Sequence, residues 1–283
     1  MDLGSFPEDQ RIPVAALSDM WTELHKLDKV GNDAICNLHK LTTWNLANHV
    51  RARKDASDID NYYDEDYVTQ HDLLRELAVY KSNQGTVGQR QRWIMEISGN
   101  TPPNWCTEQD QQLINARLLS ISTDTSFLST WCDIQAQKVE CLVLNLRTKN
   151  YSLPEFVDKM DKFKKFSTTQ LSTPFRNDQI GKGFNPFPLQ GPGFWELYYP
   201  SFKALPNLME INIDYCNDLV EFPAKLCDVI LLKKHSINHC HQLSTLPEAI
   251  GKLVNLEVLR LRSCTNLSEL PESNQKPPSI KNS

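Results

Sequence analysis

The sequence predicts a chain of mixed α+β and α/β class, in which a winged-helix domain precedes a short, interrupted leucine-rich-repeat solenoid. Two observations predict this fold. The first 82 residues read as helix, helix, hairpin and helix, in that order. Further along, prolines, cysteines and leucines recur every 24 residues. A fixed period of this size is typical of leucine-rich repeats.

The N-terminal helices are predicted from the spacing of apolar residues. Between Ile12 and Leu27 these residues fall on one helical face, and Pro13 suits the first turn. A second helix is expected over 34–47, followed by strands over 50–54 and 62–68 around a polar loop. A third helix is expected to begin near Thr69. This content is typical of a winged-helix domain, which we assign to residues 1–82.

The start of the third helix contains a candidate anion-binding residue. Thr69 and Asp72 have capping-box spacing, so His71 and Asp72 are expected in the first turn, with Leu73, Leu74 and Leu77 facing inward. Free N–H groups and the helix dipole at this end favour a phosphate near His71. The alternative is that Asp72 caps the helix and His71 is an ordinary surface residue.

The repeats are clearest between residues 203 and 273, where we expect three units. Each unit follows the pattern L-x-x-L-x-L-x-x-C-x-x-L, and its alternate apolar residues should form a strand with one buried face. The positions that recur are Pro223, Pro247 and Pro271; Cys216, Cys240 and Cys264; Leu219, Leu243 and Leu267; and Leu208, Leu232 and Leu256. His235 stands where Ile211 and Leu259 stand in the neighbouring units. We interpret it as a tolerated defect at the rim of the array and not as a ligand.

The remaining segments are assigned from their composition. Residues 83–115 are expected to form a helical linker, and "ARLLSIS" and "VECLVLNL" to open the repeats over 116–165. The segment 166–202 is rich in Pro, Gly and aromatic residues, so we expect an irregular stretch that marks the deletion of several repeats. Residues 274–283 are expected to be a disordered tail.

Composition excludes several classes of protein. The net charge of −5 gives no reason to expect nucleic-acid binding. The eight cysteines show no metal-ligand spacing, which favours reduced thiols. No secretory signal opens the chain, and no apolar run approaches the ~20 residues of a membrane helix. We therefore expect a cytoplasmic protein, with the nucleus and the plasma-membrane periphery as further locations.

Several stretches together resemble the plant intracellular nucleotide-binding leucine-rich-repeat immune receptors. They are "LGSFPEDQRIPVAALSDMW", "VTQHDLLRELA" and "INIDYCNDLVEFPAKLCD". The closest likeness is to the helper class that carries a powdery-mildew-resistance-type coiled coil. The resemblance implies that Phe6 to Asp9 opens the winged-helix subdomain of the nucleotide switch. It also implies that Gln70, His71 and Asp72 match the M-H-D motif, whose histidine approaches the β-phosphate of ADP.

The sequence departs from this family in one respect that bears on activity. No G-x-x-x-x-G-K-[ST] phosphate-binding loop occurs, since "GKGF" and "GKLV" lack the Ser or Thr and the upstream glycine. The coiled coil and nucleotide-binding core of the family would lie upstream of Met1, so we expect a C-terminal fragment. The ADP contact of His71 would then be vestigial. We expect no catalytic residue, no enzyme activity and no cofactor in this chain, although the intact family uses ADP and ATP.

Two functions remain open. In the first, the chain is a non-catalytic interaction or regulatory module in plant defence, and the resemblance implies other receptors or lipase-like immune heterodimers as partners. Its candidate protein-binding positions alternate with buried strand positions: Asn212, Asp214, Asn238, Arg260 and Arg262. The alternative is that these five side chains are ordinary solvated strand positions with no binding role. In the second, the chain is a winged-helix nucleic-acid binder that uses Arg51, Arg53 and Lys54. The acidic loop after these three residues disfavours it.

Overall fold

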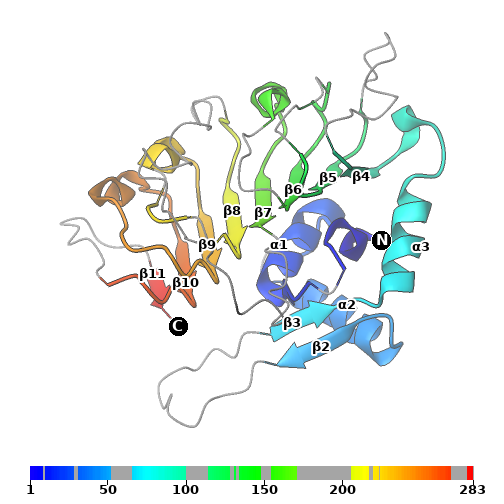
Figure 1. The fold of residues 1–283 in the computed structure, drawn as a ribbon, viewed down its shortest axis with the longest axis horizontal. Helices are drawn as coiled ribbons and strands as arrows, with labels where there is room; N and C mark the ends of the chain where they lie inside the picture. Colours follow the sequence, from blue (N-terminus) through cyan, green and yellow to red (C-terminus); the bar gives the residue numbers. More distant parts are fainter. Residues whose placement is uncertain are drawn as a thin grey trace, which may run out of the picture.

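The structure is a computed structural model, and it divides into a small N-terminal unit and a long curved parallel sheet (Figure 1). It describes residues 1–8, 10–28, 31–51, 66–99, 114–127, 131, 134–147, 154–170, 205–216, 219–222, 224–268 and 279–282. Arg53 and Lys54 lie outside these residues, and of Arg51 only the backbone strand is described.

The sheet is a leucine-rich-repeat array whose eight strands run parallel and in chain order. Short 3-10 helices return the chain between several of them: η3 (Glu155–Lys159), η6 (Ala224–Asp228) and η7 (Glu248–Lys252). The strands are β4 (Arg92–Ile97), β5 (Leu118–Thr123), β6 (Cys141–Leu146), β7 (Lys165–Gln170), β8 (Glu210–Asp214), β9 (Lys234–Asn238), β10 (Val258–Arg262) and β11 (Ser279–Asn282).

Three strands lie where the sequence predicted none. β4 falls in the expected helical linker, β7 enters the expected irregular segment, and β11 falls in the expected tail. The linker also contains the short helix η2 (Val87–Gln89). Those predictions were wrong at these residues. β4 and β11 lie at the two edges of the sheet, where unpaired N–H and C=O groups accept a further strand even though the leucine pattern is weak. β7 pairs on both sides, with β6 and β8.

The sheet continues without a break between β7 and β8. Lys165 pairs with Glu210 in register although 45 residues separate them (210 − 165), against 24 between Glu210 and Lys234. The chain between these neighbouring strands is therefore 21 residues longer than one repeat (45 − 24). The expected loss of several repeats leaves no gap in the sheet, and residues 171–204 lie outside the described part of the chain.

The interior of the array is apolar, and His235 lies within it. Its side chain is fully buried with 0% exposure, in register with Ile211 and Leu259. The ring donates from Nδ1 to the carbonyl oxygen of Ile211 at 3.1 Å and packs edge-on against Phe222. The expectation of a rim position was therefore wrong. Burial lowers the pKa of His235 to about 4, so the ring is neutral near pH 7.

The N-terminal unit contains the expected helices and hairpin strands. They are α1 (Val14–His25), α2 (Asn32–Thr43), β2 (Asn48–Arg51), β3 (Asp66–Thr69) and α3 (Asp72–Ser82), preceded by η1 (Asp2–Ser5) and β1 (Ile12–Pro13). β3 lies between β1 and β2 in a three-stranded antiparallel sheet. The winged-helix assignment itself stays a prediction. Within the described residues, no helix has the length and apolarity that a membrane span requires.

Helix α3 buries a different face from the one expected. Leu73 is 68% exposed and Leu77 is 51% exposed, whereas Arg75 and Ala78 are buried. The reason is that α3 packs on η1: Arg75 Nε donates to the Phe6 carbonyl oxygen at 2.8 Å. Gly4 approaches so closely that an added Cβ would meet the Ala78 Cβ at 2.9 Å. The leucine spacing alone therefore gave the wrong inward face.

Candidate docking surface on the repeat array

The inner face of the sheet carries the side chains that alternate with the buried leucines and isoleucines. Figure 1 shows α1 lying within the curve of the strands, against this face. Cys141 and Val143 of β6 join Leu17 and Met20 of α1 in one apolar cluster. The repeat surface is thus already in contact with a helix of its own chain.

The first residue of each of three neighbouring strands forms a charge ladder. Lys165, Glu210 and Lys234 occupy the same register position on β7, β8 and β9. Lys165 Nζ lies 2.8 Å from Glu210 Oε2, and Lys234 Nζ lies 3.7 Å from Glu210 Oε1. Opposite charges at directly paired positions stabilise neighbouring strands.

Helix α1 inserts a carboxylate into this ladder. Lys234 Nζ donates to Asp19 Oδ1 at 2.6 Å, and Lys165 Nζ donates to the Asp19 carbonyl oxygen. Burial alone would lower the pKa of Lys234, but Asp19 and Glu210 outweigh it and raise that pKa. Burial raises the pKa of Glu210, and the charge of Asp19 raises it further against the two lysines. The ladder therefore holds Lys234 charged beneath α1.

A second cluster of ion pairs fixes the C-terminal end of α1. Arg117 donates to Glu140 at 2.8 Å and to the Leu24 carbonyl oxygen at 2.6 Å. Lys26 bonds both Glu23 and Glu140, at 2.6 and 3.1 Å. Burial opposes ionisation of Glu140, but the hydrogen bonds from Arg117 and Lys26 outweigh it and lower its pKa to about 2. Glu140 is therefore ionised at neutral pH.

The predicted protein-binding positions do not form one exposed surface. Asn212 is 8% exposed, Asp214 is 2% exposed and Asn238 is 4% exposed. Asn212 lines a narrow space of about 20 Å³ with Ala16 and Met20 of α1, and Asn238 Nδ2 donates to Asp214 Oδ1 at 2.6 Å. The expectation that these three side chains face solvent was wrong, because the N-terminal unit packs over this part of the face and the polar groups bond one another.

Two of the predicted positions stay partly accessible. Arg260 and Arg262 on β10 are half-buried, and Arg260 Nη1 donates to Ser236 Oγ at 3.4 Å. They lie beyond the strands that α1 contacts through Asp19.

The residues of the predicted phosphate contact lie together at the start of α3. His71 is the N-cap residue, and its Nδ1 accepts from the Leu73 N–H at 3.3 Å. The helix begins at Asp72, so the expected cap at Thr69 was wrong. His71 and Asp72 are exposed and Gln70 is half-buried. Since the His71 side chain satisfies an N–H of the helix start itself, it competes with any anion there.

Sequence reasoning missed the charged residues that bind α1. A signal was present: Lys165, Glu210 and Lys234 alternate in sign at equivalent positions of successive strands. Nothing local paired them with Asp19, which lies 215 residues before Lys234. The described residues include no group of three or more His, Cys, Asp or Glu side chains able to hold a metal ion.

Comparisons with known proteins give relatives of one kind. No protein-family model matches the sequence. The chain is 37% identical over 273 residues to the probable disease resistance protein At5g66910 of Arabidopsis thaliana, which covers 82% of this chain and 32% of that protein. It is 38% identical over 267 residues to At5g66900, with the same coverage, and 34% identical over 272 residues to At5g66890, covering 83% of this chain and 64% of that protein.

The chain thus spans about a third of the length of the first two relatives. Among solved structures, the leucine-rich-repeat domain of the type III effector XopL matches with a TM-score of 0.35 and 16% identity, over 94% of this chain and 93% of that one. That likeness adds nothing to the repeat geometry described above. On its sequence relatives, the chain belongs to the plant disease resistance proteins of the nucleotide-binding leucine-rich-repeat class.

Proposed function

We propose that this chain is a non-catalytic interaction and regulatory module in plant defence. The observation that carries the proposal is the docking of α1 on the inner face of the repeat array through Asp19 and Lys234. A repeat surface that holds a helix of its own chain by charge pairs offers the chemistry needed to hold a partner protein in the same way. The disease resistance relatives fit such a role.

In this proposal residues 1–82 are the winged-helix subdomain of the family, and the position of this subdomain decides which part of the repeat surface is accessible. The order of α1, α2, β2, β3 and α3 supports this assignment. Gln70, His71 and Asp72 are the remnant of the ADP contact, and the nucleotide switch operates only in the intact family. The exposed positions of the His71 and Asp72 side chains support a residual contact at most.

The partner surface proposed here is the part of the inner face beyond α1. Arg260 and Arg262 are half-buried there, and guanidinium groups suit the acidic groups of a protein partner. Other receptors of the family, or the lipase-like heterodimers that the family resemblance implies, are the proposed partners. Asn212, Asp214 and Asn238 lie on the same face of the neighbouring strands β8 and β9, in register with Arg260 or Arg262, and would form the buried border of this surface.

The test is co-expression in leaf tissue with an intact receptor of the helper class and its activator, read out as ion leakage. The chain alone should cause no cell death, and an excess of it should weaken the response of the intact receptor. The double variant Arg260→Glu/Arg262→Glu should lose this effect, whereas Lys233→Glu, an exposed charge change in the preceding repeat, should keep it. Cell death from the chain alone, or an unaltered response at any excess, would reject the proposal.

A further inference from the structure

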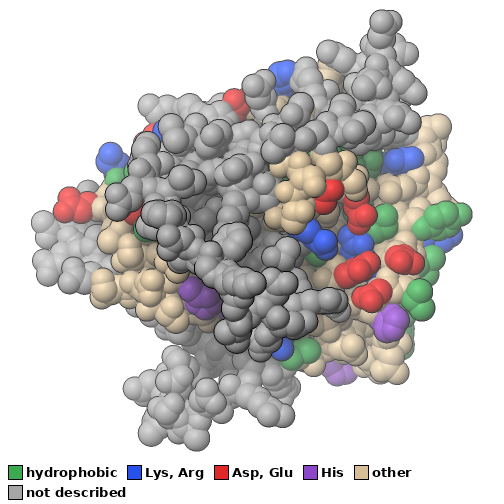
Figure 2. Space-filling view, viewed as in Figure 1, with side chains coloured by type: hydrophobic (Ala, Val, Ile, Leu, Met, Phe, Trp, Pro, Cys, Tyr) green, Lys and Arg blue, Asp and Glu red, His purple; other side chains and the backbone are tan. Residues whose placement is uncertain are grey.

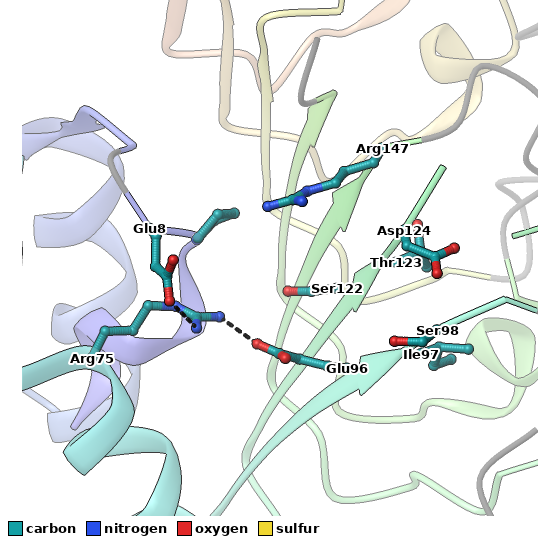
Figure 3. A pocket seen from close by; sticks show the side chains of 10 residues that line it. Glu8, Arg75, Glu96, Ile97, Ser98, Ser122, Thr123, Asp124 and Arg147 are labelled. Carbon is teal, nitrogen blue, oxygen red and sulfur yellow. Dashed lines mark hydrogen bonds and ion pairs between the residues drawn. The ribbon is translucent and has the colours of Figure 1, made fainter. Parts of the chain in front are cut away.

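A cavity of about 210 Å³ lies where the N-terminal segment and α3 meet the ends of β4, β5 and β6. Its walls come from three places: Glu8 from the N-terminal segment, Arg75 from α3, and Glu96, Ser122 and Arg147 from the repeat sheet. In Figure 3 Arg147 extends across the cavity, Ser122 directs its hydroxyl into it, and Arg75 and Glu96 close the opposite side. In Figure 2 basic and acidic side chains gather beside α3 on this face.

Most of the charges in these walls already have partners. Arg75 Nη2 donates to Glu96 at 2.9 Å, and Arg75 Nη1 lies 3.7 Å from Glu8. Both oxygens of Asp124 accept backbone N–H groups, from Gly99 at 2.7 Å and from Ser126 at 2.9 Å. Arg75 and Asp124 are thus satisfied by contacts within the chain.

On the wall formed by β5 and the residue after β6, two groups have capacity to bind a ligand. Arg147 has no hydrogen bond or ion pair with any residue in the part of the chain that the structure describes. Ser122 Oγ accepts from Asn145 Nδ2 at 3.2 Å, which leaves its own proton to donate into the cavity. A guanidinium and a hydroxyl donor on one wall suit a carboxylate.

The opposite wall carries surplus negative charge. Arg75 is one cation shared by two carboxylates, and Glu8 and Glu96 keep 48% and 57% of their side-chain surface exposed. A simple anion bound at Arg147 would be repelled by these carboxylates, and a simple cation bound beside them would be repelled by Arg147. A small ligand that carries both a carboxylate and an ammonium satisfies both walls.

The size of the cavity limits the ligand. The cavity volume of about 210 Å³ is below the roughly 300–1,000 Å³ of drug-sized sites, which favours a small ligand. We propose that this cavity binds a free α-amino acid, with its carboxylate on Arg147 and Ser122 and its ammonium toward Glu8 and Glu96. This site does not depend on the function proposed above.

The experiment is isothermal titration of the full chain with single amino acids of increasing size, including glycine, glutamine and leucine. At least one should bind with a Kd below about 1 mM. Its N-acetyl derivative, which lacks the ammonium, and its carboxamide, which lacks the carboxylate, should each bind at least tenfold more weakly. Arg147→Gln and Glu8→Gln should weaken binding by a similar factor. Arg11→Gln, an exposed arginine that does not line the cavity, is the matched control.

Thermal unfolding of each variant shows whether the fold is intact, and neither cavity variant removes a hydrogen bond that holds α3. The proposal is wrong if no amino acid binds at about 10 mM, or if Arg147→Gln binds like the unmodified chain. Equal affinity for the N-acetyl derivative would also overturn it, because the site would then recognise only an anion.

Discussion

Lys234 of the repeat sheet donates to Asp19 of helix α1 at 2.6 Å, across 215 residues of sequence. We predict that Lys234→Met lowers the free energy of unfolding by about 1–3 kcal/mol, because Asp19 and Glu210 then lose a partner in a largely buried place. Urea unfolding measures this change. The neighbouring Lys233→Met removes only the exposed 3.5 Å pair with Glu257 and should change stability by less than about 0.5 kcal/mol. Equal effects of the two variants would show that α1 is not held by this contact.

His235→Leu should stabilise the protein, and most strongly in acid. The folded-state pKa of His235 is about 4 against an ordinary value of 6.5. The unfolded chain therefore takes up a proton first as the pH falls, and stability is lost between about pH 6.5 and pH 4. The full loss is about 3 kcal/mol by linkage. Urea unfolding at pH 7 and pH 4.5 should show a smaller difference for the leucine variant. His241→Leu, at an exposed histidine, should leave the difference unchanged.

Glu140→Gln should destabilise the protein in a lower pH window. The folded-state pKa of Glu140 is about 2 against an ordinary value of 4.5, so its contribution is present above about pH 4.5 and is lost as the pH falls toward 2. At pH 7 the variant should lose about 1 kcal/mol, because solvent screens ion pairs with the partly exposed Lys26 and Arg117. Glu257→Gln, at an exposed carboxylate, is the control. A loss that persists unchanged at pH 2.5 would mean that the charge of Glu140 is not its cause.

Gly4→Ala should separate α3 from η1. The added methyl would lie 2.9 Å from the Ala78 Cβ, which forces the helix to shift and lowers stability by about 1–3 kcal/mol. Gly88→Ala adds the same methyl at an ordinary contact of 3.6 Å and should be nearly neutral. Thermal unfolding compares the two. A neutral Gly4→Ala would contradict the packing of α3 on the N-terminal segment.

ADP with Mg²⁺ should bind this chain no more tightly than about 1 mM, because His71 already accepts the Leu73 N–H and no phosphate-binding loop accompanies it. Isothermal titration measures the affinity, and ATP hydrolysis should be absent. His71→Ala should change neither result. Micromolar binding that disappears in His71→Ala would show that the motif still holds nucleotide.

The sequence by itself determined the repeat array and the order of elements before it. The 24-residue period placed β8, β9 and β10 correctly, because alternate apolar residues and a fixed spacing allow one buried face for each strand. The helical spacing of Leu17, Met20, Trp21 and Leu24 likewise placed α1 and its buried side. These are local patterns, and each strand or helix carries its own.

Only the tertiary structure decided which surfaces remain free. Asn212 and Asp214 alternate with buried residues as a solvent-facing pair would, yet α1 and a neighbouring asparagine enclose them. Leu73 and Leu77 look like a core face, yet α3 presents Arg75 and Ala78 to η1 instead. The cause is the same in both cases: the free energy of burying a side chain depends on the partner that covers it. Here that partner lies tens to hundreds of residues away, in contacts that periodicity does not encode.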